Sequence, residues 1–323
     1  IRQIRVPIAP APEQPRILAA LESYLSRLDA AVAGLKRVQA NLKRYRASVL
    51  KAAVEGRLVP TEAELARQEG RDYEPASVLL ERMLKERRRR WEEAELARLK
   101  ASGKAPKDDR WKTHYEEPEA PDTRSMPTLP AGWCWGVVDV LSLLVEYGSS
   151  AKTSESASGV PVLRMGNIVD GGLELEDLKH LPNEHPEFPE LLLKENDLLF
   201  NRTNSAELVG KSAVFHGAPK PCSYASYLIR VRFPEGIQSE YVSAYLNSVA
   251  GRAWVASVKI QQVGQANVNG TKLKGCHVPL PPAVEQDRIV VELTSQHVVF
   301  RRTVSELDLH RRRCARLRQA ILK

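Results

Sequence analysis

The stretch that decides the fold of this chain occurs twice. Residues 6–18 read VPIAPAPEQPRIL and residues 278–290 read VPLPPAVEQDRIV, so eight of thirteen positions are identical at an offset of 272 residues. Each copy leads into a long stretch without proline. Proline is compatible with the first turn of a helix but not with its interior. We therefore expect each lead-in to start one long helix, the first over residues 12–56 and the second over residues 283–323.

An apolar repeat of seven residues runs through both expected helices. A period of seven over four heptads is typical of a coiled-coil seam, in which a cysteine can act as a small hydrophobe. The helical stretch after each lead-in should run about 38 residues, or about 57 Å at a rise of 1.5 Å per residue, and we expect the two helices to pair as a rigid spacer. The seam positions are Leu21, Leu28, Leu35, Leu42 and Val49 in the first helix, and Leu293, Phe300, Leu307, Cys314 and Ile321 in the second.

Composition restricts the class of protein. The chain has 323 residues, a net charge of +8 and four scattered cysteines, and we find neither a signal peptide nor an apolar run long enough to span a membrane. These features favour a cytoplasmic protein in a reducing compartment. The basic charge balance favours a polyanionic partner such as nucleic acid.

Between the two helices the amino-acid composition changes once, near residue 130. Residues 57–130 are rich in charge and proline and predict a helical and irregular linker. Its run Arg87–Arg90 is flanked by glutamates, which favours a salt-bridged helix face over a phosphate site. Residues 131–282 contain short apolar runs separated by turn residues, which predict a strand-rich α/β domain.

Motifs of catalysis are missing from the sequence. Gly210-Lys211-Ser212 ends like a phosphate-binding loop, but Ser205 stands where that loop needs its first glycine. HExxH, GxSxG and the dinucleotide-binding glycine pattern do not occur, and the seven histidines lack metal-ligand spacing. We therefore expect a non-catalytic chain that binds neither a metal nor a cofactor.

Polar residues gather in three glycine-containing clusters of the strand-rich domain, RMGNIVDGG, NRTNSAELVGKS and QQVGQANVNGTKLKG. Arg, Lys, Asn and Gln can contact base edges, and Ser and Thr can bind phosphates. The alternative is that these side chains cap their own turns. The candidate DNA-binding residues are Arg164, Asn167, Arg202, Thr203, Asn204, Ser205, Lys211, Gln265, Asn267 and Lys272.

The order of these features resembles the specificity subunits of type I restriction-modification enzymes. The matching motifs are Leu129-Pro130-Ala131-Gly132-Trp133, Glu195-Asn196-Asp197-Leu198-Leu199, Asn201–Ser205, Gln265-Ala266-Asn267-Val268-Asn269 and Pro279–Ile289. The resemblance implies an α+β fold, with a strand-rich target-recognition domain flanked by two long helices that pair as an antiparallel coiled coil. It also implies that residues 1–11 are the last strand and lead-in of a first recognition domain that is otherwise missing from this sequence, a view that fits a chain beginning with Ile1.

The same resemblance implies a function and partners. The chain would read one half of a bipartite target in double-stranded DNA and dock two methyltransferase subunits, together with restriction and translocase subunits. S-adenosylmethionine, ATP and magnesium would belong to those partner subunits, which carry adenine methylation and ATP-dependent cleavage. Two alternatives remain, a half-size protein that homodimerises to read a gapped palindrome and a scaffold that reads no sequence.

Overall fold

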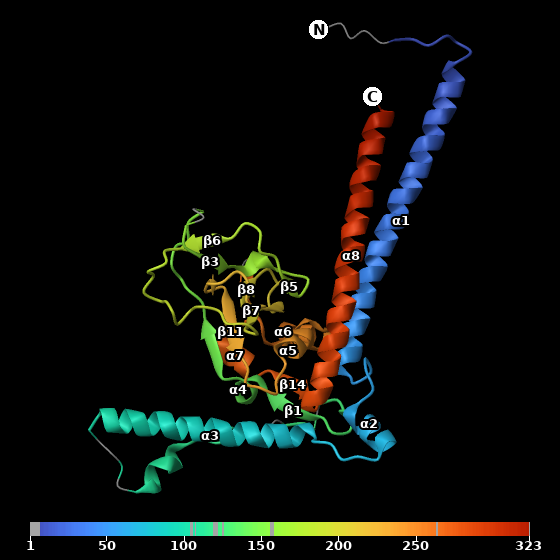
Figure 1. Ribbon diagram of the computed structural model, residues 1–323. Coiled ribbons are helices and arrows are strands. Elements are labelled where there is room, and N and C mark those ends of the chain that lie inside the picture. Colours follow the sequence, from blue (N-terminus) through green and yellow to red (C-terminus); the bar gives the residue numbers. More distant parts are fainter. Residues whose placement is uncertain are drawn as a thin grey trace. The chain divides into compact units, whose positions relative to one another are not determined.

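The computed structural model describes residues 7–103, 106, 108–118, 122–124, 126–155, 158–262 and 264–322 (Figure 1). The predicted strand at residues 1–5 lies outside this part. Two compact units make up the chain: a helical unit of residues 1–48 and 294–323, and a sheet unit of residues 49–293. No helix in the described part is both long enough and apolar enough to cross a membrane.

Two long helices, α1 (Gln14–Val54) and α8 (Ala283–Ile321), begin at the two lead-ins and pair in the helical unit (Figure 1). Near the end of α1, the Tyr45 hydroxyl donates to Gln296 Oε1 over 2.9 Å. Near its start, Asp29 accepts from Arg318 Nη1 over 3.1 Å. Because early residues of α1 meet late residues of α8, the pairing is antiparallel, as the resemblance implied. This confirms the predicted fold class.

The heptad positions occupy the buried stripe of these helices. Leu28, Phe300 and Leu307 are at most 9% exposed, and the remaining seven seam residues are half-buried. The guanidinium of Arg46 also lies 5.2 Å from the centre of the Phe300 ring. A two-helix coil can cover only one stripe of each helix, which explains why burial stays incomplete.

The core of the sheet unit is a four-stranded antiparallel sheet in the order β2 (Leu144–Tyr147), β11 (Leu228–Arg232), β7 (Leu198–Asn201) and β9 (Ser212–Val214). Every residue of β7 and β9 is buried, so both faces of these strands are covered. Helix α5 (Ser239–Asn247) packs on β7 and β9, and α6 (Val249–Val258) follows it.

Smaller elements complete the sheet unit. The short sheets are β10–β3–β6 (Ser223–Tyr224, Val160–Leu163, Lys179–Leu181), β12–β13–β8 (Ile260–Gln262, Gln265–Asn267, Thr203–Asn204), β1–β14 (Cys134–Val137, His277–Leu280) and β4–β5 (Ile168–Val169, Gly172–Leu173). The short helices are α2 (Glu62–Glu69), α4 (Val138–Leu141), α7 (Gly270–Lys274), η1 (Asp109–His114) and η2 (Met165–Asn167).

The segment predicted as a linker contributes to the core of the sheet unit. Within it, α3 (Ala76–Ala101) buries Ala76, Leu79 and Met83 in the main hydrophobic cluster. The arginine run follows further along α3, where Arg89 and Arg90 both pair with Glu86, and Arg87 pairs with Asp139 over 2.6 Å. The face is salt-bridged, as the flanking glutamates predicted.

The second lead-in anchors the start of α8 in the sheet unit. Glu285 is fully buried and accepts hydrogen bonds from Trp133 Nε1 over 2.9 Å and from the backbone N–H of Glu62 over 2.8 Å. Burial raises the pKa of Glu285 above its ordinary value. Gln286, also fully buried, accepts from the Gln238 backbone N–H over 2.9 Å. Two motifs far apart in the sequence, LPAGW and EQDRI, therefore meet in one buried contact.

Candidate nucleic-acid interface

Two of the predicted polar clusters meet on neighbouring strands. Strands β8 and β13 pair so that Thr203 lies opposite Asn267, and Asn267 Nδ2 donates to Thr203 Oγ1 over 2.8 Å. Ala266, between Gln265 and Asn267, is buried at 1% exposure. Because side chains alternate along a strand, Gln265, Asn267 and Thr203 share the opposite face. We call these three residues the polar strand face; Gln265 is exposed and the other two are half-buried.

Arg202 directly precedes Thr203 in the chain, and its side chain is held by an aromatic ring. Its guanidinium lies 4.8 Å from the centre of the Tyr147 ring, within the range of a cation–π contact. The Tyr147 hydroxyl accepts a hydrogen bond of 2.7 Å from the backbone N–H of Gly270. Arg202 Nη1 also donates to the Ser226 carbonyl over 3.3 Å. The arginine is therefore oriented before any ligand binds.

Sequence reasoning missed Tyr147 and Tyr227. The backbone N–H of Arg202 donates to the Tyr227 carbonyl over 3.0 Å, which places that residue beside the arginine. The two tyrosines are 42% and 48% exposed, so part of each side chain is accessible to a ligand. Neither tyrosine belongs to a polar cluster. The one signal that we find in the sequence is the turn sequence Tyr-Gly-Ser-Ser at residues 147–150, which begins with Tyr147.

Other candidate residues of these two clusters already make hydrogen bonds within the protein. The backbone N–H of Asn201 donates to the Lys211 carbonyl over 2.8 Å, so the half-buried Lys211 directly precedes β9, the strand that pairs with β7. The Asn204 side chain accepts from the Ser205 backbone N–H over 2.8 Å. Lys272 Nζ donates to the Val258 carbonyl. The Asn204 side chain thus already stabilises its own loop, and Lys272 connects α7 to the end of α6.

The third cluster belongs to a different sheet. Asn167 is 6% exposed, and its Nδ2 donates to the Glu174 carbonyl over 2.8 Å while its Oδ1 accepts from the Arg164 backbone N–H over 2.8 Å. Arg164 Nη2 donates to the Asp177 carbonyl over 3.0 Å. Asn167 therefore has an internal role in shaping its turn, which is the alternative that the sequence left open for all of these residues.

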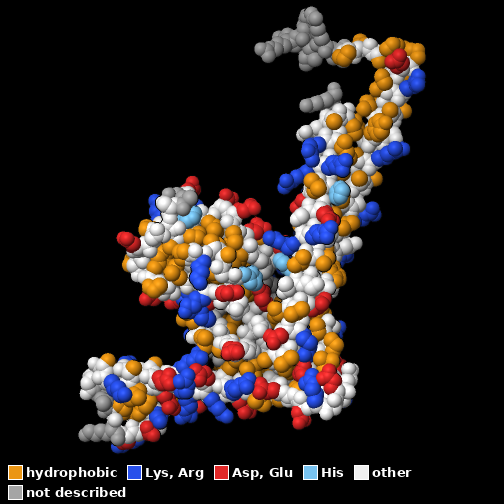
Figure 2. Space-filling model, in the orientation of Figure 1, with side chains coloured by type: hydrophobic (Ala, Val, Ile, Leu, Met, Phe, Trp, Pro, Cys, Tyr) orange, Lys and Arg blue, Asp and Glu red, His pale blue; other side chains and the backbone are white. Residues whose placement is uncertain are grey.

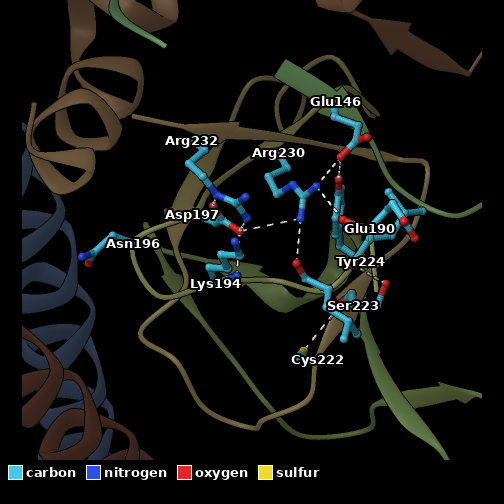
Figure 3. A network of polar contacts seen from close by, with 12 residues as sticks. Glu146, Glu190, Lys194, Asn196, Asp197, Cys222, Ser223, Tyr224, Arg230 and Arg232 are labelled. Carbon is cyan, nitrogen blue, oxygen red and sulfur yellow. Dashed lines mark hydrogen bonds and ion pairs between the residues drawn. The ribbon is translucent and has the colours of Figure 1, made fainter. Parts of the chain in front are cut away.

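A buried ionic network supports the strands that carry Arg202 and Tyr147 (Figure 3). Arg230 on β11 is 2% exposed and donates to the Leu192 carbonyl over 2.7 Å and to the Glu146 carboxylate on β2. Asp197, fully buried at the start of β7, accepts from both Nε and Nη2 of Arg232 over 2.7 Å.

This network explains the ENDLL motif at residues 195–199. Buried charges are stable only when they are paired and hydrogen-bonded, so Asp197 and the two arginines depend on one another. The contacts tie β2, β7 and β11 together, and Tyr147 and Arg202 lie at or just beyond the ends of β2 and β7. Asn196 adopts φ 68°, a left-handed conformation that asparagine tolerates better than most residues. The motif therefore supports the candidate interface without belonging to it.

Comparisons with known proteins agree on one family. The EcoKI type I restriction enzyme specificity subunit of Escherichia coli K12 is 25% identical over 291 residues, which cover 89% of this chain and 49% of that protein. The EcoAI specificity subunit of Escherichia coli is 25% identical over 260 residues, covering 79% of this chain and 40% of that protein. No protein-family model matches the chain.

A solved structure shares the fold. A chain from a study of complex assembly and conformational transition in the type I R-M system superposes with a TM-score of 0.60 at 16% identity, covering 98% of this chain and 60% of that one. The solved chain shows that the fold is shared, and the curated relatives are specificity subunits of type I restriction enzymes. The chain is similar over most of its length to type I restriction enzyme specificity subunits. It spans about half the length of the curated relatives it matches.

Proposed function

We propose that this chain reads one half of a bipartite sequence in double-stranded DNA for a type I restriction-modification complex. The observation that carries the proposal is the pairing of β8 with β13, which unites the polar strand face directly after the pre-oriented Arg202 in the chain. Arginine contacts guanine edges with two parallel hydrogen bonds, and asparagine and glutamine contact adenine in the same way. The exposed Tyr147 and Tyr227 would add apolar contacts to bases or sugars.

The helical unit supports a second part of the proposal, the docking of two methyltransferase subunits. Besides its seam, α1 carries a second heptad stripe of Ile17, Tyr24, Val38 and Tyr45, which are 45–56% exposed. An exposed apolar stripe at coiled-coil spacing suits partner helices. In this proposal the chain itself is not a catalyst, and S-adenosylmethionine, ATP and magnesium act in the methyltransferase and the restriction and translocase subunits.

The alternative of a half-size protein that homodimerises through its helices receives less support. Its seam residues would have to pair between chains, whereas here α1 and α8 pair within one chain. The scaffold alternative predicts that DNA affinity does not depend on the candidate interface, so that a triple alanine variant at Arg164, Arg202 and Gln265 would bind DNA unchanged.

The decisive experiment maps methylated adenines in DNA modified by this chain together with its methyltransferase subunits. We expect a gapped motif, and we expect Arg202→Ala to relax the base preference at one position or abolish modification, since a bidentate base contact contributes about 1–3 kcal/mol. Arg110→Ala removes an exposed arginine whose side chain, among the residues that the structure describes, pairs only with neighbouring Asp108, and it should leave the motif intact. An unchanged motif in the Arg202 variant would contradict the role of this surface.

A further inference from the structure

Positive charge is distributed unevenly between the two units. The helical unit contains 17 Lys and Arg against 5 Asp and Glu, a net charge of +12, whereas the sheet unit contains 31 against 35, a net charge of −4. The whole basic excess of the chain therefore belongs to the paired helices and not to the domain that carries the candidate base contacts. Figure 2 shows Lys and Arg side chains, in blue, outnumbering acidic ones along the two helices.

Five arginines of α8 form one exposed face of this unit. At 3.6 residues per turn, Arg301, Arg302, Arg312, Arg313 and Arg316 fall within an arc of about 120° on the side opposite the seam. All five side chains are exposed. They cover about 22 Å of helix length at 1.5 Å per residue. We call these residues the outer arginine face.

Three of the five arginines of this face have no acidic partner in the part of the chain that the structure describes. Glu306 pairs with Arg302 over 3.1 Å, while Asp308 and Asp29 pair with Arg311 and Arg318, which lie outside the arc. Within the part of the chain that the structure describes, Arg312, Arg313 and Arg316 form no ion pair. Like charges this close repel one another, so the face gains energy when it meets an extended anion.

The chemistry of the face suits a nucleic-acid backbone better than a protein. Between residues 301 and 316 we find one large apolar side chain that is exposed, Leu309 at 59%, and it lies within the arc of the arginines. A protein interface of this size would need a larger apolar centre. Duplex DNA offers about one phosphate charge per 1.7 Å of axis, and the guanidinium group matches phosphate with two parallel hydrogen bonds.

From these observations we infer that the outer arginine face binds the sugar–phosphate backbone of double-stranded DNA without reading its sequence. The inference rests on the proposed function in that it assumes a DNA-binding subunit. It adds that attraction to DNA is supplied by the coiled coil, while the sheet unit, with its net negative charge, supplies selectivity. Affinity and specificity would then reside in separate parts of one chain.

The test measures binding of the full chain to a short random-sequence duplex over a range of salt concentrations. Glutamine keeps good helix propensity, so the triple variant Arg312→Gln, Arg313→Gln, Arg316→Gln should fold normally. Each lost phosphate contact lowers the slope of log affinity against log salt by about 0.9, so we expect the slope to fall by up to about 2.7. The methylation motif should stay the same, because no base contact is removed.

A matched control separates the face from net charge alone. Lys36→Gln, Arg37→Gln, Lys43→Gln removes the same charge from α1, where these residues do not share the outer arginine face, and it should change the slope much less. An equal loss in both variants would overturn the assignment to this face. So would an unchanged slope in the arginine variant together with lost binding of methyltransferase subunits, since the face would then bind protein.

The outcomes also distinguish this inference from the proposed function. If the unsubstituted complex modifies a defined motif but the arginine variant keeps its full salt dependence, only the inference fails. If the unsubstituted complex shows salt-dependent binding and no sequence preference in binding or modification, the proposed function fails while the arginine face can still be supported.

Discussion

The two lead-ins are nearly the same in sequence but differ in their surroundings. In the second copy, Glu285, Gln286 and Ile289 are each 0% exposed. The two polar side chains bond to Trp133 Nε1 and to backbone N–H groups of the sheet unit, and Ile289 joins its main hydrophobic cluster. These residues do more than start a helix, because each of them binds the domain that precedes it.

In the first copy the equivalent residues meet solvent. Glu13 and Gln14 are exposed, Ile17 is 46% exposed, and the Gln14 side chain donates only to the nearby Ala9 carbonyl over 2.9 Å. Helix α1 nevertheless begins at Gln14. The comparison teaches that the prolines and the following heptads suffice for a helix start. The shared EQxRI residues are instead a docking motif, whose energy depends on a partner surface.

The largest difference in stability is expected between alanine variants of the two equivalent isoleucines, Ile289 and Ile17. Ile289→Ala should lower the free energy of unfolding by about 3 kcal/mol, because it removes a fully buried side chain and leaves a cavity. Ile17→Ala, at a site that is 46% exposed, should cost less than about 1 kcal/mol. Urea unfolding followed by tryptophan fluorescence would measure both. Similar losses in the two variants would show that the first lead-in is also docked.

A smaller effect is expected for the two glutamates. Glu285→Ala should cost about 2 kcal/mol, since it leaves the Trp133 indole N–H and the Glu62 backbone N–H buried without an acceptor. Glu13→Ala should change stability little, because its side chain is exposed. Combining each with Trp133→Phe in a double-mutant cycle sharpens the contrast.

In that cycle we expect a coupling of about 1 kcal/mol between Glu285 and Trp133, and none between Glu13 and Trp133. Zero coupling in both cycles would mean that the buried hydrogen bond contributes nothing to docking. The unfolding slope against urea serves as the control, since an altered slope would indicate a change in the unfolded state instead.

Much of the helical unit was predictable because its pattern is local. A seven-residue apolar period can be counted along the chain, and all ten predicted seam residues are buried or half-buried. The antiparallel direction of pairing could not come from periodicity and rested on the resemblance. Likewise, the prediction of a linker at residues 57–130 did not indicate that Leu79 and Met83 would be buried in the core of the sheet unit.

The candidate interface was less predictable because it depends on contacts distant in sequence. The polar clusters pointed to Arg202 and Asn267, but their alignment requires β8 to pair with β13. Tyr147 belongs to the candidate interface only because β2, which lies more than 50 residues earlier in the sequence, ends where the ring of its last residue contacts the Arg202 guanidinium. Asn167 was predicted to contact DNA but is buried and shapes its own turn. The amino-acid composition of a cluster does not show which of its side chains face solvent and which bond within the turn.

The smallest effect expected from the comparison is a pH dependence at Glu285. Burial raises its pKa above the ordinary value of 4.5, so the folded state binds more protons than the unfolded state at pH values just above 4.5. The stability contributed by its neutral form is fully present below 4.5 and is lost as the pH rises through the raised pKa. The unsubstituted chain should therefore lose stability over this window relative to Glu285→Ala.

The neighbouring Glu62 does not obscure this window. Burial alone would raise its pKa, but hydrogen bonds from Arg71 and Arg288 lower it below 4.5, so its contribution is lost only as the pH falls through that lower value. Urea unfolding at pH values on both sides of 4.5 would separate the two groups. Glu13→Ala should follow the pH profile of the unsubstituted chain. If Glu285→Ala follows it as well, then Glu285 is not as thoroughly desolvated as its contacts indicate.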